Sequence, residues 1–205
     1  MDKVSLAREL AALAQTGLHY TKDPFDRERY QRLREISNEL LADASNLDEV
    51  DIIQWRTSEH GYATPKVGVR AFILQDDKVF LVHEDADPGR WTLPGGWADV
   101  NEPPSYSVIR EVMEESGYEV EVKQLMAVLD REKQGHIPPH PYHMIKLFFH
   151  CEIVGGSPQA TLESSQSGFF AIDDLPDLSL SRVLPGQIRM LYEMIANEDS
   201  TTKFD

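Results

Sequence analysis

Residues 96–118 read GWADVNEPPSYSVIREVMEESGY, and this stretch predicts a loop, a helix and a sharp stop. Pro103 and Pro104 suit the first helical turn, because the N–H that a proline lacks has no partner there. Gly117 suits the left-handed residue that commonly ends a helix. We therefore expect a helix over residues 104–116, with the apolar Val108 and Val112 on its buried side.

Three carboxylates share one face of this helix. Glu111, Glu114 and Glu115 stand at i, i+3 and i+4, a spacing at which like charges weaken an isolated helix by a few tenths of a kcal/mol per pair, roughly. A divalent cation compensates for this repulsion, and Mg²⁺ prefers oxygen ligands while leaving positions for water and phosphate. Arg110 is placed to orient a carboxylate through a bidentate pair. The alternative is a solvated acidic face, typical of acidic helices.

A fixed spacing pattern disfavours that alternative. The stretch fits Gly-x5-Glu-x7-Arg-Glu-hydrophobic-x-Glu-Glu-x-Gly-hydrophobic throughout, at Gly96, Glu102, Arg110, Glu111, Val112, Glu114, Glu115, Gly117 and Tyr118. This pattern resembles the signature of the Nudix hydrolases, although Tyr118 stands where an aliphatic residue is more usual. The resemblance implies an α/β/α sandwich around a mixed sheet, with the signature as loop-helix-loop. It also implies hydrolysis of a nucleoside diphosphate linked to a moiety X.

The resemblance also implies roles for individual residues. Glu111, Glu114 and Glu115 would be the metal ligands, helped by the Gly96 carbonyl, with Glu114 and Glu115 acting directly in catalysis. Arg110 would take part in catalysis as an orienting residue, together with Glu102. Glu163, in ATLESSQSGFF, is a candidate metal ligand or general base, against the alternative of an ordinary exposed glutamate. The expected cofactor is Mg²⁺, with Mn²⁺ left open.

A wider resemblance extends over nearly the whole chain. GLHYTKDPFDRERYQRLREISNEL, TPKVGVRAFI, RWTLPGGWADV, FFHCEIVGG and GFFAIDDLPDLS resemble a bacterial subgroup with a helical N-terminal extension. That subgroup includes CDP-choline pyrophosphatases and ADP-ribose pyrophosphatase-like proteins, which implies a small nucleotide as substrate. Two other functions stay open: hydrolysis of nucleoside triphosphates or dinucleoside polyphosphates, and a non-catalytic ligand sensor of the same fold.

The region before the signature is expected to be helical. One apolar stripe comprises Leu6, Leu10, Leu13 and Ala14, and a second comprises Tyr30, Leu33, Ile36, Leu40 and Leu41. Gly17 is suited to end the first helix, and Asp23-Pro24 predicts a turn. Two helices cannot bury both stripes by themselves. We therefore expect residues 1–62 to form a helical domain that mediates homodimerisation or supports the substrate site.

Residues 63–205 are expected to form the second domain, with an α+β fold. Strands are predicted within 67–84, broken by a turn at Gln75-Asp76-Asp77, and then at 118–130, 144–156 and 168–172. A short helix and a linker are expected over 46–65 and a last helix over 186–196, followed by a frayed end. Strands mixed with few helices indicate a mixed sheet flanked by helices.

Further residues are candidates for substrate binding. Arg70 lies on the first strand of the second domain and Trp91 precedes the signature loop; packing is the alternative for both. Residues 130–146 concentrate basic side chains, including Arg131, His136, His140 and His143. The histidine spacing could suggest zinc, but Pro138, Pro139 and Pro141 exclude a helix that would present them together. We therefore expect a loop bordering the substrate.

Composition restricts the remaining possibilities. The formal net charge of −15 repels a polyphosphate backbone, so nucleic acid is not expected as a partner. No apolar run is long enough to cross a bilayer. The single cysteine, Cys151, excludes an internal disulfide framework, and a cytoplasmic location is expected.

Overall fold

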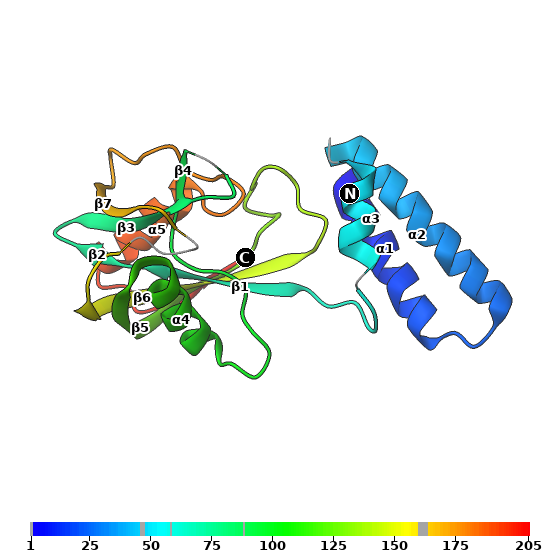
Figure 1. Ribbon diagram of the computed structural model, residues 1–205, viewed down its shortest axis with the longest axis horizontal. Helices are drawn as coiled ribbons and strands as arrows, with labels where there is room; N and C mark the ends of the chain where they lie inside the picture. Colours follow the sequence, from blue (N-terminus) through cyan, green and yellow to red (C-terminus); the bar gives the residue numbers. More distant parts are fainter. Residues whose placement is uncertain (1, 46–47, 58, 88, 160–163) are drawn as a thin grey trace. The chain divides into compact units, whose positions relative to one another are not determined.

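The computed structural model describes residues 2–45, 48–57, 59–87, 89–159 and 164–205. The chain forms two compact units (Figure 1). The helical unit comprises Met1–Pro65 together with Pro138–His143, and the sheet unit comprises Lys66–Ile137 together with Met144–Asp205. The break after Pro65 lies close to the boundary expected after residue 62. The inclusion of 138–143 in the helical unit was not expected.

The helical unit contains α1 (Lys3–Tyr20), α2 (Pro24–Ser45) and α3 (Glu49–Thr57). The side chain of Asp2 caps α1 by accepting a hydrogen bond from the N–H of Ser5 at 2.9 Å. The prediction that Gly17 ends α1 is wrong, because the helix continues to Tyr20. A Cβ at position 17 would lie 2.4 Å from the Tyr30 ring. This glycine therefore permits the close approach of α1 and α2.

Small side chains form the buried face of α1. Ala7 and Ala14 are fully buried, and the Ser37 hydroxyl donates a hydrogen bond to the carbonyl of Ala7 at 2.6 Å. Two members of the predicted stripe, Leu6 and Leu13, are 40% and 54% exposed. Their exposure agrees with the expectation that the two helices cannot bury both stripes by themselves. Small residues allow the helix backbones to approach, which leaves the larger leucines outside.

The described residues of the sheet unit form eight strands in two sheets. They are β1 (Lys66–Phe72), β2 (Leu74–Gln75), β3 (Lys78–Glu84), β4 (Arg90–Thr92), β5 (Tyr118–Asp130), β6 (Met144–Gly156), β7 (Ser167–Ala171) and β8 (Lys203–Phe204). One sheet has the order β1-β6-β5-β8, with β5 and β6 antiparallel and the other two pairs parallel. In the other sheet β2, β4 and β7 all pair antiparallel with β3. The expected mixed sheet is confirmed.

The prediction for the hairpin turn and the prediction for the C-terminus had opposite outcomes. Asp76 and Asp77 have φ of 50° and 56°, the conformation that a two-residue hairpin turn requires, so the predicted turn is confirmed. The frayed C-terminal end was a wrong prediction. Lys203 of β8 pairs with Ala127 of β5, and the Gln134 amide donates a hydrogen bond to Asp205 at 2.7 Å. This pairing depends on the distant strand β5.

Two hydrophobic cores cover opposite faces of the strands. Val108 and Val112 of α4 (Pro104–Ser116) are fully buried in a core that includes Val69 and Ala71 of β1. The other core contains residues of α5 (Pro185–Ala196) and Phe72 of β1. Successive strand residues therefore point to opposite helices. The strands lie between α4 and α5, which confirms the α/β/α sandwich and both predicted helices (Figure 1).

Candidate active site

The loop before α4 runs along β1 as an additional antiparallel segment. The N–H of Val69 donates a hydrogen bond to the Gly96 carbonyl at 2.9 Å, and the N–H of Ala71 donates one to the Pro94 carbonyl at 2.8 Å. Gly95 has a φ of +139°, and a Cβ there would lie 2.1 Å from the Val69 carbonyl oxygen. Only glycine fits this contact. The loop is therefore held against β1 at a fixed position.

Two carboxylates of α4 meet this loop. The N–H of Gly95 donates a hydrogen bond to Oε2 of Glu115 at 2.8 Å. A Cβ on Gly96 would lie 2.6 Å from Oε2 of Glu111, whose side chain is 11% exposed. Burial raises the pKa of Glu115 to about 8, although Arg70 and the Gly95 N–H oppose this, and the charge of Glu111 adds to the increase. The environment of Glu115 therefore penalises its negative charge.

Arg110 contacts several carboxylates of the signature. It donates to Glu102 at 3.2 Å and to Glu114 at 2.7 Å, and it forms ion pairs with Glu111 at 3.2 Å and Asp99 at 3.1 Å. Burial disfavours its charge, but the hydrogen bonds to Glu102 and Glu114 outweigh burial, so the pKa of Arg110 is raised. Glu114 is thus directed toward Arg110.

The donor chemistry of this site fits a divalent cation. Within the described residues, no three Asp, Glu, His or Cys side chains already converge as a complete metal site. Glu111 and Glu115 nevertheless offer oxygen donors beside a loop where a Cβ on Gly96 would fill the space in front of Glu111. The Gly96 carbonyl, which accepts one hydrogen bond, keeps a second lone pair. An all-oxygen set of this kind suits Mg²⁺ or Mn²⁺.

Arg70, on β1, donates hydrogen bonds to the backbone of the loop before α4. It is 7% exposed, and its Nη1 donates to the carbonyl of Leu93 at 3.3 Å and also to the carbonyl of Gly95. Burial lowers the pKa of Arg70 to about 10, and the charge of Glu115 opposes that decrease. Both backbone polar groups of Gly95 are therefore bound: its N–H donates to Glu115, and its C=O accepts from Arg70.

Trp91 packs among neighbouring rings. Its ring lies 4.7 Å from that of Phe170 and 5.7 Å from that of His83, both edge to face. Its backbone N–H donates to the carbonyl of Asp177 at 2.8 Å. These contacts fix Trp91 in the sheet unit, while its predicted contact with substrate stays a prediction.

His136 and Arg131 are buried in the sheet unit. His136 is 3% exposed, and its Nδ1 lies 2.9 Å from the Leu180 carbonyl while its Nε2 lies 3.1 Å from Nε2 of Gln187. This pattern assigns a neutral ring with the proton on Nδ1. Burial, together with the charge of Lys146, lowers the pKa of His136 to about 3. Arg131 is 1% exposed and pairs with Glu132 at 2.5 Å.

His140 and His143 belong to the segment 138–143 of the helical unit. The Nε of Arg8 donates to the His140 carbonyl at 2.8 Å. Arg56, 7% exposed, donates from Nη1 to Asn38 at 2.9 Å and from Nη2 to the Pro141 carbonyl at 3.5 Å. The six predicted substrate-binding residues are therefore divided between the two units, with four in the sheet unit and two in this segment.

Two charged residues that form an ion pair, Glu84 and Arg182, were not predicted, and one predicted residue cannot be placed. Glu84 at the end of β3 forms an ion pair with Arg182, and its charge contributes to the raised pKa of Glu115. A glutamate that ends the strand-like run KVFLVHE was the only sequence signal for it. Glu163 lies outside the described residues.

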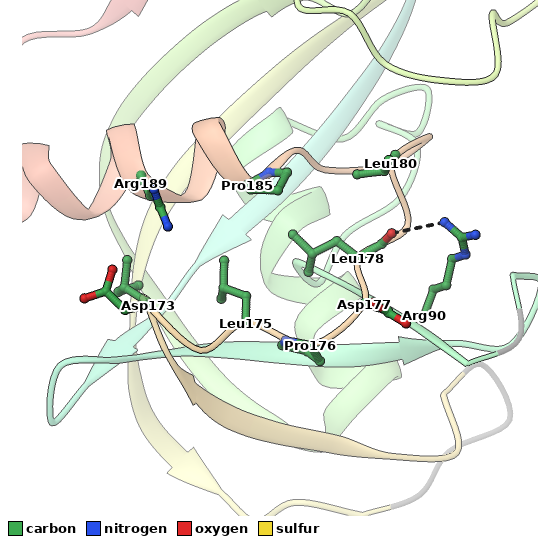
Figure 2. Close-up of a pocket in the computed structure, with 10 residues that line it drawn as sticks. Arg90, Asp173, Leu175, Pro176, Asp177, Leu178, Leu180, Pro185 and Arg189 are labelled. Carbon is green, nitrogen blue, oxygen red and sulfur yellow. Dashed lines mark hydrogen bonds between the residues drawn. The ribbon is translucent and has the colours of Figure 1, made fainter.

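A surface pocket of about 480 Å³ lies elsewhere on the sheet unit. Figure 2 shows its lining and the 3.5 Å hydrogen bond from Arg90 to the carbonyl of Leu178. The lining comes from β4, from the segment 172–180 and from the first turns of α5, and it includes no residue of 96–118. This pocket is therefore separate from the carboxylates of α4.

Comparison with known proteins agrees with this geometry. Residues 64–192 match the NUDIX domain, and residues 2–55 match a domain described as UDP-X-like, N-terminal oligomerisation domain. A putative ADP-ribose pyrophosphatase, YjhB, of Bacillus subtilis (strain 168) is 40% identical over 199 residues, which cover 97% of this chain and 95% of the relative.

Two solved structures are also similar. A UDP-X diphosphatase is 35% identical with a TM-score of 0.65, and the match covers 100% of both chains. An ADP-ribose pyrophosphatase from Streptococcus suis is 39% identical with a TM-score of 0.63, covering 69% of this chain and 100% of that one. The fold and the carboxylate site thus define the class, hydrolases that act on phosphoanhydrides. The chain belongs to the Nudix hydrolase family.

No helix among the described residues is long and apolar enough to cross a membrane.

Proposed function

We propose that this protein hydrolyses the diphosphate linkage of a nucleoside diphosphate-X, of the ADP-ribose or CDP-choline type, to a nucleoside monophosphate and phospho-X. One P–O bond of the bridge breaks, the oxygen of water joins one phosphorus, and the other phosphate leaves with the bridging oxygen. The supporting observation is the pair Glu111 and Glu115, which face the Gly95-Gly96 loop. The names of relatives, ADP-ribose pyrophosphatase and UDP-X diphosphatase, support this substrate class.

Glu111 and Glu115, with Glu114 and the Gly96 carbonyl, are the residues that would hold Mg²⁺ or Mn²⁺. A bound divalent ion supplies neutralisation of the diphosphate charge and a lower pKa for bound water. Arg110 orients the carboxylates, because its guanidinium donates to Glu102 and Glu114. Arg70 donates to the C=O of Gly95 and Glu115 accepts from its N–H, so the two side chains fix the backbone at this residue. Glu163 stays our candidate for positioning or deprotonating the attacking water.

A panel of substrates tests this proposal. ADP-ribose, CDP-choline and a UDP-sugar are incubated with Mg²⁺ or Mn²⁺, beside ATP and a dinucleoside polyphosphate, and products are identified by ³¹P NMR. We expect two phosphomonoesters from at least one nucleoside diphosphate-X, and loss of turnover when a chelator removes the metal. Efficient cleavage of triphosphates alone would overturn the substrate class. Absence of all turnover would favour a non-catalytic sensor, against which the complete set of signature carboxylates argues.

We also propose that the protein is a homodimer joined through its helical unit. The description of the domain matched by residues 2–55 supports oligomerisation. Leu6, Leu13 and Tyr20 recur every seven residues on α1 and are 40%, 54% and 64% exposed. Such a stripe on one helix face suits contact with a second copy. A cytoplasmic location is proposed as well, supported by the single cysteine, Cys151, which is buried and free.

A further inference from the structure

Buried cations bind the backbone of the segment 179–182, which lies between β7 and α5. Arg131 donates from Nε to the Ser181 carbonyl at 3.3 Å. Lys146, 2% exposed, donates to the Ser181 carbonyl at 3.4 Å and also to the Arg182 carbonyl. Two cationic side chains from β6 and from the end of β5 therefore fix the backbone on either side of residue 182.

His136 binds the same segment from another direction. Its Nδ1 lies 2.9 Å from the carbonyl of Leu180, and the N–H of Ile137 donates to the same carbonyl at 3.3 Å. Ser179 is fully buried, and its hydroxyl donates to Asp87 at 2.9 Å. The segment 179–182 is thus attached to three neighbouring parts of the sheet unit, which gives residue 182 a well-defined position.

This attachment concentrates positive charge that is poorly solvated. Burial lowers the pKa of Lys146 well below its ordinary value, and the charges of Arg70, Arg131 and Arg182 lower it further. Placing several cations together away from water is unfavourable unless they meet negative charge. Glu84 and Glu132 provide part of that charge. An anionic ligand would provide more.

Arg182 is the least buried member of this group, although its Nε, the atom that meets Glu84, is itself buried. Its side chain is 35% exposed, whereas Arg70, Arg131 and Lys146 are 7%, 1% and 2% exposed as whole residues. Its guanidinium forms an ion pair with Glu84, whose side chain is 14% exposed. The charge of Glu84 acts on Glu115 and on Arg70, and the charge of Arg182 also acts on Arg70. Lys146, which donates to the Arg182 carbonyl, pairs with Gly68 of β1, two residues before Arg70, and Arg70 donates to the Gly95 carbonyl in the loop before α4. Arg182 is therefore linked to that loop through Lys146 and Arg70.

We propose that Arg182 binds a phosphate oxygen of the diphosphate substrate, and that Glu84 holds its guanidinium in place until the substrate replaces that carboxylate. The proposal rests on the function proposed above. A guanidinium matches phosphate geometry with two parallel N–H donors. On substrate binding, the Glu84 carboxylate would be replaced as the acceptor by a phosphate of higher negative charge. In a protein with a net charge of −15, such a fixed cation offsets the repulsion of the anionic substrate.

Binding of methylenediphosphonate in the presence of Mg²⁺ tests the proposal, because this probe contains a diphosphate that cannot be hydrolysed and no base. Its dissociation constant is measured by calorimetry for the full-length protein. We expect Arg182→Met to weaken binding about 10- to 100-fold, the loss typical of one charge-assisted contact, and Arg182→Lys to restore part of it. Arg189→Met removes an exposed arginine of α5 outside the cluster and should leave binding unchanged.

Glu84→Gln separates the proposed role from a structural one. If Glu84 competes with substrate for Arg182, this variant binds the probe as tightly as the unmodified protein or a few-fold more tightly. A few-fold gain is the change in affinity that corresponds to losing an exposed ion pair, on the order of its small free energy. Equal weakening by Glu84→Gln and Arg182→Met, or binding by Arg182→Met within two-fold of the unmodified protein, overturns the proposal. Circular dichroism checks that each variant is folded. Cleavage of triphosphates alone would refute the proposed substrate class without altering the Arg182 result.

Discussion

The backbone N–H of Gly95 donates a 2.8 Å hydrogen bond to Oε2 of Glu115, which joins the loop before α4 to the last turn of the same helix. The helix therefore returns its carboxylate to the loop from which it starts. Because Arg70 binds the carbonyl of the same glycine, the position of Glu115 depends on the position of the loop along β1.

Replacing Glu115 by glutamine should lower kcat by about 100-fold or more, because loss of a group that only supports a metal ligand already costs about 10- to 100-fold. The free energy of unfolding should change by less than about 1 kcal/mol, because Val108 and Val112 keep α4 attached to the core. Steady-state kinetics at saturating Mg²⁺ and urea denaturation give the two values. Glu193→Gln, on the exposed side of α5, is the matched control. Normal turnover of the Glu115 variant would remove this assignment.

Gly95→Ala should destabilise the protein more than Gly135→Ala does. Both glycines have positive φ, of 139° and 82°, so both alanines are strained. Only at position 95 would the new Cβ meet the backbone, 2.1 Å from the Val69 carbonyl, whereas nothing lies within 4 Å at position 135. We expect about 1 kcal/mol at position 135 and at least about 2 kcal/mol more at position 95. Urea denaturation measures both, and similar losses would contradict the close approach.

Protonation of His136 should destabilise the fold. Its folded pKa, lowered by burial to about 3, lies below the ordinary value of 6.5, so the unfolded chain binds the proton more readily. Its contribution to stability is present above pH 6.5 and is lost as the pH falls toward 3, by up to about 1.4 kcal/mol per pH unit. His136→Asn keeps a donor near the Leu180 carbonyl without titrating. The difference in unfolding free energy between the two proteins should shrink from pH 7 to pH 4; a constant difference would refute it.

The full-length protein should be a dimer at micromolar concentration. Leu13→Glu places a charge in the exposed stripe of α1, where Leu13 is 54% exposed, and should yield monomers. Val154→Glu, at a 62% exposed position of β6, is a matched apolar-to-acidic control that should stay dimeric. Light scattering after gel filtration gives the mass of each. A monomeric unmodified protein would contradict the proposal.

The sequence predicted those elements whose signals are local. The helix over 104–116 has prolines at its start and a glycine at its stop, and the structure gives these bounds. The strands over 118–130 and 144–156 also have the predicted bounds. The short strand β8 and the continuation of α1 through Gly17 were missed, because each depends on a distant partner, Ala127 in one case and Tyr30 in the other.

The site was predicted less completely than the fold. Helical spacing placed Glu111 and Glu115 on one face and placed Arg110 to orient a carboxylate, as its 2.7 Å hydrogen bond to Glu114 shows. It could not show that Glu115 accepts a hydrogen bond from the N–H of Gly95. The pairing of Glu84 with Arg182 joins residues nearly a hundred positions apart, and no local pattern marks it. The sequence also did not predict that Arg131 and His136 are buried, since a basic, proline-rich stretch is typical of exposed loops.

The segment 138–143 has a consequence for how the protein can be divided. Its backbone carbonyls are bound by Arg8 and Arg56 of the helical unit, while both its ends continue into β5 and β6 of the sheet unit. The chain therefore passes between the units three times, after residues 65, 137 and 143. A cut at residue 65 would not release an independent module, because the carbonyls of His140 and Pro141 would lose their hydrogen-bond donors, Arg8 and Arg56. Recombination between relatives would have to exchange the helices and this segment together.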